Sequence, residues 1–174
     1  SSMSVRGVRC NRLLKDSKRW STVNLGEAGA EANIKALNWT NDSGERILVF
    51  NATIPTVKNN VDICLFSSNI DDYDLKALVR HDERALMFGE LKGGIDPAGA
   101  DEHWKTGNTA LNRIRTSFAA AGYPQMRTSF VGAAIERAMA EEIYAQLESG
   151  TLTNATNLTN NNQLIEYCNW LIEL

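Results

Sequence analysis

The stretch GELKGGIDPAGADEHWK, residues 89–105, decides how the rest of the sequence is interpreted. Glu90 and Lys92 lie two positions apart, so on a strand their side chains face the same side. Two glycines and an Asp-Pro pair then predict a loop. The cluster at residues 101–105 begins a helical pattern, which gives the order strand, glycine loop, helix.

The length and composition of the chain indicate a single folded domain. With 174 residues, of which 43% are hydrophobic, the chain suffices for one domain with a sizeable core. We find no apolar run of membrane length and no signal-peptide pattern, so a cytoplasmic protein without membrane contact is expected. The three cysteines are scattered, which favours reduced thiols over a zinc site. A net charge of −3 does not by itself indicate a nucleic-acid partner.

Periodicity predicts alternating helices and strands. The expected elements are a helix over 25–39, strands over 46–54, 60–66 and 84–92, a helix over 102–122, a strand from 124 that passes into a helix over 135–150, and a helix over 164–174. This order indicates an α/β (α+β) core over residues 1–150. The Thr/Asn-rich segment 151–163 is expected to be a flexible linker to a C-terminal docking helix, 164–174.

Basic residues are concentrated near the N-terminus. Residues 1–20 hold six cations and one acid, and the cations recur about every third position, along one side of a helix. Two interpretations stay open, namely a solvated helix and a stripe that contacts phosphates.

The candidate chemistry combines two strands. Asp62 lies in the apolar strand 60–66, where a buried charge is costly without a cation or hydrogen-bond donors. If this strand neighbours the one that holds Glu90 and Lys92, the three side chains converge. Two carboxylates suit Mg²⁺, and the lysine can orient water or neutralise charge. Taken alone, acid-x-Lys is also typical of the polar face of an edge strand.

The longer segment FGELKGGIDPAGADEHWKTGNTALNRIR, residues 88–115, resembles the catalytic segment of type II restriction endonucleases. The resemblance is to the AvaI/BsoBI kind within the PD-(D/E)XK nuclease superfamily, with the XcyI kind as a near alternative. It covers roughly residues 60–118, about a third of the chain. It implies a mixed central sheet flanked by helices. It also implies a homodimeric enzyme of a restriction-modification system that uses Mg²⁺, or Mn²⁺ in its place, to hydrolyse double-stranded DNA at a short G/C-rich palindrome.

The resemblance also implies roles for single residues. Asp62 and Glu90 would be metal ligands, Lys92 the catalytic lysine and His103 a general base. His103 has an alternative as the first-turn residue of a helix, packed on Trp104.

Further candidates concern the metal and the DNA. Glu31 is a candidate accessory metal ligand, with Glu27 an equal choice. Asp96 is a candidate for accepting a hydrogen bond from cytosine N4, or else it begins the Asp-Pro turn. Candidates for phosphate or base contacts are Lys58, Asn59, Lys105, Asn108, Arg113 and Arg115. The two arginines fit the solvent face of the helix equally well.

The sequence also departs from the family pattern. Val61 stands before Asp62, where the superfamily often has proline, and little sequence precedes the expected first helix, whereas the AvaI/BsoBI kind has a substantial helical N-terminal part. Two alternative functions therefore stay open. One is a structure- or lesion-specific repair nuclease on the same core, and the other is a non-catalytic DNA-binding fragment.

Overall fold

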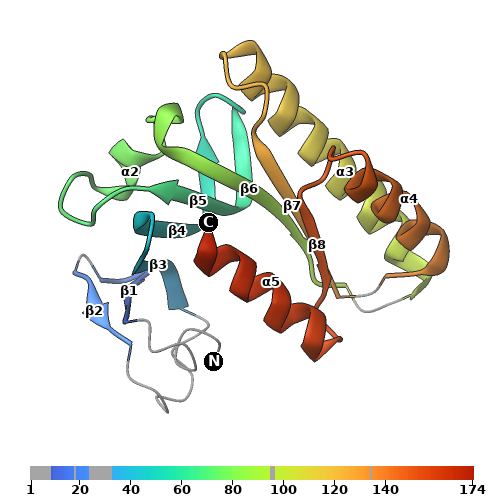
Figure 1. Cartoon of the computed structure of the whole chain (residues 1–174), viewed down its shortest axis with the longest axis horizontal. Coiled ribbons are helices and arrows are strands. Elements are labelled where there is room, and N and C mark those ends of the chain that lie inside the picture. The colour runs from blue at the N-terminus through green and yellow to red at the C-terminus, as the bar shows by residue number, and fades with distance from the viewer. Residues whose placement is uncertain (1–8, 18, 24–32, 95–96, 134) are drawn as a thin grey trace.

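A computed structural model describes residues 9–17, 19–23, 33–94, 97–133 and 135–174 of the chain. Within them one mixed sheet has the strand order β2-β1-β3-β4-β5-β6-β7-β8 (Figure 1). The strands are β1 (Cys10–Leu14), β2 (Ser21–Thr22), β3 (Ile34–Asn41), β4 (Gly44–Ile54), β5 (Asn59–Ser67), β6 (Ala85–Lys92), β7 (Arg127–Gly132) and β8 (Asn154–Asn157). The helices are α2 (Leu75–Leu78), α3 (Pro97–Ala120), α4 (Arg137–Glu148) and α5 (Asn161–Glu173), with a short 3-10 turn, η2 (Asp82–Arg84).

Chain connections explain why the sheet is mixed. Neighbouring strands from β2 to β6 pair antiparallel, whereas β6, β7 and β8 pair parallel. Parallel neighbours need a long crossover, which α3 and α4 provide. Short turns join β3 to β4 and β4 to β5, whereas a longer segment with α2 and η2 joins β5 to β6. Gly44, with φ of +118°, closes the turn between β3 and β4 because glycine adopts this backbone conformation without steric cost.

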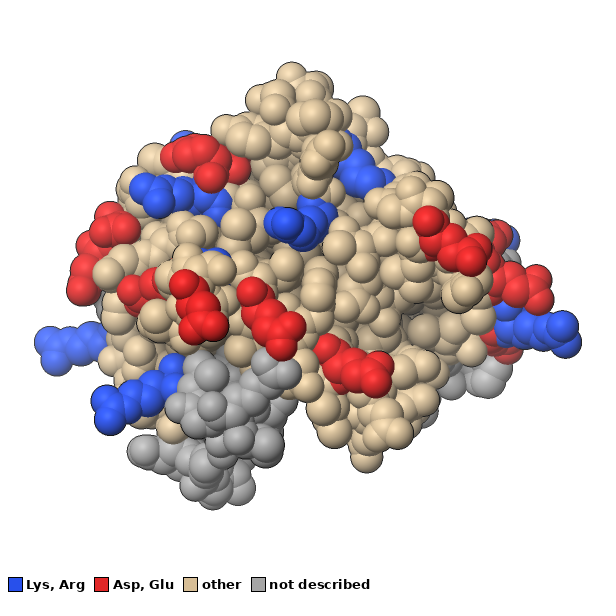
Figure 2. Space-filling view, in the orientation of Figure 1, with Lys and Arg blue, Asp and Glu red and all other residues tan. Residues whose placement is uncertain are grey.

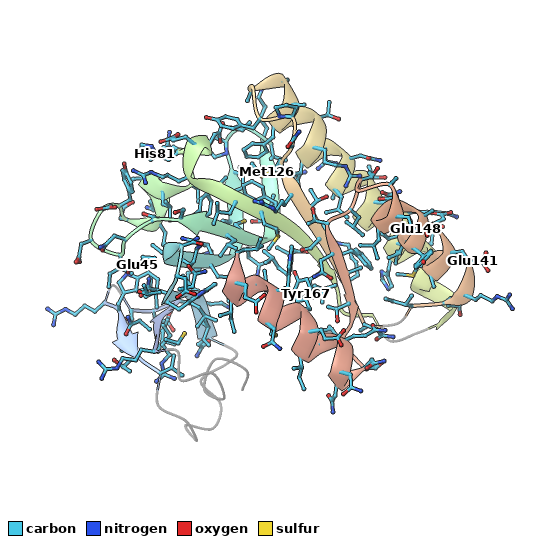
Figure 3. The ribbon with its side chains drawn as sticks, in the orientation of Figure 1. Glu45, His81, Met126, Glu141, Glu148 and Tyr167 are labelled. Atoms are coloured by element: carbon cyan, nitrogen blue, oxygen red, sulfur yellow. The ribbon has the colours of Figure 1, made fainter. Side chains whose placement is uncertain are left out.

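Helices cover both faces of the sheet. On one face, the apolar side chains of α3 and α4 join those of β4, β5 and β6 in the larger core, which includes Phe88, Trp104 and Phe118. On the other face, α5 covers a smaller cluster. Figure 3 shows Tyr167 on the side of α5 that is turned toward the sheet, where its hydroxyl lies 2.8 Å from Ser129 Oγ. The predicted α/β core with a mixed sheet flanked by helices is therefore confirmed.

Among the described residues, no single basic patch dominates the side of the molecule seen in Figure 2. The acidic and basic side chains of the described residues are interspersed there. None of the helices in the described ranges is long and apolar enough to cross a membrane.

Most predicted elements between residues 46 and 150 are confirmed. The strands expected over 46–54, 60–66 and 84–92 are β4, β5 and β6, and the long helix is α3. It ends as its glycine predicts, because Gly122 has φ of +95° and the amide of Tyr123 donates to the Phe118 carbonyl at 2.8 Å. The strand from 124 and the helix that follows are β7 and α4.

Three predictions on secondary structure are wrong. The helix expected over 25–39 is, in its described part from Ile34, strand β3, because pairing with β4 outweighs a short i, i+3 apolar spacing. The basic stripe expected on an N-terminal helix lies partly on strand β1, where a spacing of three residues points to alternate faces. The expected linker 151–163 contains β8, which extends the sheet through parallel pairs with β7.

Candidate active site

Strands β5 and β6 pair along their apolar halves and separate at their polar ends. Their backbone ladder runs as far as the pair Ile63↔Gly89. The next residues on the two strands are Asp62 and Glu90. Beyond that pair a side chain makes the contact between the two strands, because Asp62 Oδ2 accepts a hydrogen bond from the Leu91 amide at 2.9 Å. The backbone pairing between β5 and β6 therefore ends next to Asp62 and Glu90.

Lys92 joins these two carboxylates. Its Nζ lies 3.0 Å from Glu90 Oε2 and 3.8 Å from Asp62 Oδ2. The spacing of two residues between Glu90 and Lys92 puts both side chains on one face of β6, as the sequence predicts. The structure thus brings Asp62, Glu90 and Lys92 together, although they come from two strands and are up to thirty residues apart.

Glu90 has an environment that opposes its ionisation. The residue is only 5% exposed, and this burial raises the pKa of its carboxyl group. The hydrogen bond from Lys92 lowers that pKa again, whereas the neighbouring carboxylate of Asp62 raises it. A buried carboxylate beside a second one gains stability from any positive charge that enters the site.

The arrangement fits a hard divalent cation. Among the described residues no group of three or more His, Cys, Asp and Glu side chains converges, so Asp62 and Glu90 are the acidic side chains that this part of the chain brings together here. Mg²⁺ is commonly held by one or two carboxylates and keeps several waters. Asp62 and Glu90 provide that donor set, while Lys92 compensates part of their charge.

A cleft of about 540 Å³ opens beside the three residues. One wall is the start of β5, with Asn59 and Asn60. The other wall is a face of α3, with Lys105, Thr106, Thr109 and Arg113. Of the predicted DNA contacts, Asn59, Lys105 and Arg113 therefore lie at the cleft. Their amide and cationic groups are suited to phosphate oxygens.

Close packing fixes α3 next to β7. Trp104 Nε1 donates to Glu142 Oε2 of α4 at 2.5 Å, and its ring meets Phe130 edge-to-face at a centroid distance of 5.0 Å. A side chain at Gly107 would come within 2.7 Å of the Phe130 ring, so glycine is required for this approach. Lys105 and Thr106 are thereby carried to the edge of the cleft on a firmly packed helix.

His103 lies at the start of the same wall. It is half-buried, and a methyl group added to Gly94 would overlap its imidazole ring. Gly94 follows Lys92 by two residues, so His103 stands beside the chain as it leaves β6. It is not among the residues that line the cleft.

Three other predicted DNA contacts lie elsewhere. Lys58 is exposed in the turn between β4 and β5, with φ of +57°. Asn108 Oδ1 accepts from Gln146 Nε2 at 3.1 Å. Arg115 donates to Thr128 Oγ1 at 2.9 Å and to Asn112 Oδ1 at 2.6 Å, and its partial burial lowers its pKa. Asn108 and Arg115 thus make intramolecular contacts, which gives each a structural role.

Three predicted residues fall outside the described part of the chain, namely Glu31, its alternative Glu27, and Asp96. The described cleft contains Asn60, Thr106 and Thr109, which sequence reasoning missed. The helical period was the available signal, because residues 105, 106, 109 and 113 share one face of a helix.

Comparisons with known proteins identify one family along the chain. The family described as Restriction endonuclease BsobI matches residues 1–174. The chain is 51% identical over 144 residues to the type II restriction enzyme BsoBI of Geobacillus stearothermophilus, which covers 83% of the chain and 44% of that relative. It is 42% identical over 174 residues to the type II restriction enzymes AvaI of a Nostoc species and of Anabaena variabilis, covering the whole chain and 55% of each relative. The chain thus spans about half the length of the curated relatives it matches.

Proposed function

The chain belongs to the BsoBI restriction endonuclease family, and on this premise we propose that it carries the catalytic centre of a Mg²⁺-dependent endonuclease. The proposed substrate is double-stranded DNA with a short G/C-rich palindrome. The observation that carries the proposal is the convergence of Asp62, Glu90 and Lys92 where β5 and β6 separate. The products would be a 5′-phosphate and a 3′-hydroxyl.

In this proposal the two carboxylates hold the cation. Asp62 is fixed by the Leu91 amide, and Glu90 is held by Lys92 and by burial. When bound, Mg²⁺, or Mn²⁺ in its place, would polarise the phosphodiester and lower the pKa of a water molecule. Its positive charge would also relieve the repulsion between the paired carboxylates.

Lys92 and His103 would handle charge and protons. The ammonium group of Lys92, 3.0 Å from Glu90 Oε2, is placed to neutralise negative charge that develops on the phosphate. His103 would accept the proton of the attacking water, because a neutral imidazole is a base near physiological pH. Its ring stands against Gly94, close to the end of β6.

The wall of α3 would bind the DNA backbone. Lys105 and Arg113 provide cations along the cleft, while Thr106, Thr109 and Asn59 provide neutral hydrogen-bonding groups. Asp96 would accept a hydrogen bond from cytosine N4 in the major groove. A palindromic site has two-fold symmetry, so two copies of the chain would each cut one strand.

Digestion of a plasmid of known sequence with Mg²⁺, followed by sequencing of the ends, tests the proposal. Cutting at one fixed palindrome is expected, whereas cutting at branched or damaged positions would favour a repair nuclease. Glu90→Ala and Lys92→Ala are expected to abolish cleavage while DNA binding persists. Matched controls are Glu148→Ala on α4, labelled in Figure 3, and Lys76→Ala on α2, because both side chains are exposed. Undiminished cleavage by Glu90→Ala or Lys92→Ala would refute the proposed site, and binding without cleavage by the unaltered chain would favour a DNA-binding fragment.

A further inference from the structure

The pairing of β4 with β5 is interrupted at Asp62. Backbone pairs are present on either side, at Phe50↔Ile63 and at Ala52↔Val61. The position between them would pair Asn51 with Asp62. Asn51 has φ of +51°, a left-handed conformation that is rare for a non-glycine residue inside a strand. The irregularity therefore lies directly opposite the proposed metal ligand.

A side chain from the next strand occupies the backbone groups that this irregularity exposes. Lys35 of β3 donates from Nζ to the Phe50 carbonyl at 2.7 Å and to the Asn51 carbonyl at 2.8 Å. The regular β3–β4 ladder ends one residue earlier, at Ala36↔Val49. An ammonium group that donates to two neighbouring carbonyls makes charge-assisted hydrogen bonds with both, and these stabilise the local backbone.

Strand β5 is bent at the same level. Cys64 Sγ lies 3.6 Å from the Val61 carbonyl oxygen. In an extended strand, three residues advance the chain by about 10 Å, and such a contact is out of reach. The bend lies between Val61 and Cys64, and it includes Asp62. Within this bend, Asp62 Oδ2 accepts a hydrogen bond from the Leu91 amide of β6, the strand that neighbours β5 on the side away from β4.

We propose that Lys35 and Asn51 are positioning residues, which hold the bend in β4 and β5 and thereby aim the Asp62 carboxylate at the end of β6. Neither residue lines the cleft, so each acts through Asp62. Lys35 binds the two carbonyls on β4, and Asn51 supplies the left-handed backbone between them. The consequence for cation binding rests on the function proposed above, whereas the placement of Asp62 does not.

Amide hydrogen exchange of the cation-free protein tests the placement directly. The reporter is the Leu91 amide, which Asp62 protects, and the reference is the Met87 amide in the paired part of β6. Lys35→Met keeps the aliphatic chain and removes the donors. It is expected to raise the ratio of Leu91 to Met87 exchange rates about tenfold or more, because local opening replaces a fixed contact. Lys35→Arg restores a donor and is expected to keep the ratio within about threefold of the unaltered chain.

Substitutions of Asn51 separate backbone conformation from side-chain contact. Glycine adopts positive φ freely, so Asn51→Gly should retain the Leu91 protection to within about threefold. Valine does not, and Asn51→Val should lose it to the extent that Lys35→Met does. If Asn51→Val does not fold, Asn51→Ala is measured in the same way. Gly122→Val is the control, since it strains a left-handed residue at the end of α3 and should leave the ratio unchanged.

Calorimetric titration with Mg²⁺ adds the functional consequence. Lys35→Met and Asn51→Val should weaken cation binding about tenfold, whereas Asn51→Gly and Gly122→Val should not. An unchanged Leu91 exchange ratio in Lys35→Met or in Asn51→Val, or in Asn51→Ala where the valine variant does not fold, would overturn the positioning role, whatever the cation titration gives. An unaltered chain that neither binds Mg²⁺ nor cuts DNA would refute the proposed function and leave the exchange result to decide the positioning.

Discussion

The two ends of the β5–β6 pair differ in almost every physical respect. At one end, Phe66 and Phe88 are buried and in contact at a centroid distance of 6.0 Å, and the backbones are paired there with one register shift between Leu65 and Phe66. At the other end the ladder has stopped, and Asp62, Glu90 and Lys92 face a cleft. The apolar end gains stability from removing surface from water, and the polar end holds like charges close together at a cost. The chain thus supports an unfavourable charge arrangement on a firmly packed base.

The largest effect is expected from Phe88→Ala at the packed end. Phe88 is fully buried and contacts Phe118 of α3 at a centroid distance of 4.8 Å. Truncation leaves a cavity and should lower the free energy of unfolding by about 3–5 kcal/mol. Denaturant unfolding measures this loss. Calorimetry under native conditions should find cation affinity nearly unchanged, and a tenfold or greater loss of affinity would show that the two ends are not separable.

Lys92→Met should have the opposite effect, a large loss of cleavage with a small loss of stability. It removes the ammonium and keeps the length of the side chain, so cleavage at saturating Mg²⁺ should fall about 10²–10³-fold, as when one transition-state donor is lost. Its effect on unfolding should be smaller than that of Phe88→Ala, since Lys92 lies at the cleft. Single-turnover cleavage and denaturant unfolding give the two values. A loss of stability equal to that of Phe88→Ala, with normal cleavage, would reverse the proposed division.

Sequence reasoning located the polar end well. The period of two placed Glu90 beside Lys92, and the single aspartate in an apolar strand pointed to Asp62. The structure confirms that these three residues meet, and the mixed sheet is the predicted core. Their chemical roles stay predictions. Local patterns succeeded here because strands β5 and β6 are neighbours in the sheet and their side-chain alternation is clear.

Prediction failed where distant partners decide the structure. Residues 34–39 have a helix-like spacing, yet Trp39 is buried in strand β3, and its Nε1 donates to the Ile172 carbonyl of α5, 133 residues away. The polar segment that contains β8 was interpreted as a linker because its parallel pairing with β7 is invisible in local composition. The double contact of Lys35 likewise depends on how β3 lies beside β4, so no sequence pattern indicated it.

Gly94→Ala should have a smaller effect, confined to the proton transfer. The added methyl group would overlap the His103 ring and displace it. We expect the cleavage rate constant to fall about tenfold, because a misplaced general base loses part of its contribution, and cation affinity to stay unchanged. Gly93→Ala is a matched control, since a side chain there meets nothing within 4 Å. Equal cleavage by the two variants would count against a role for His103.

The smallest effect concerns the stability of the cation-free protein and its dependence on pH. Because burial raises the Glu90 pKa, the folded state binds this proton more tightly than the unfolded chain does. Stability should therefore fall as the pH rises from the ordinary glutamate value of about 4.3 through the raised folded value, and ionised Glu90 then remains a cost at neutral pH. Glu90→Gln removes that cost.

In chelator at pH 7, Glu90→Gln should accordingly be slightly more stable than the unaltered chain, and this difference should shrink as the pH falls below the ordinary glutamate value. Adding Mg²⁺ should reverse the order, because a cation that binds only the folded state stabilises the chain that retains both carboxylates. Thermal unfolding at several pH values, with and without Mg²⁺, measures the crossing. Glu148→Gln, at an exposed position on α4, should show neither effect. A less stable Glu90→Gln in chelator at pH 7 would mean that the Lys92 contact outweighs the cost of burying the charge. The polar end of the strand pair would then make a net contribution to the stability of the fold.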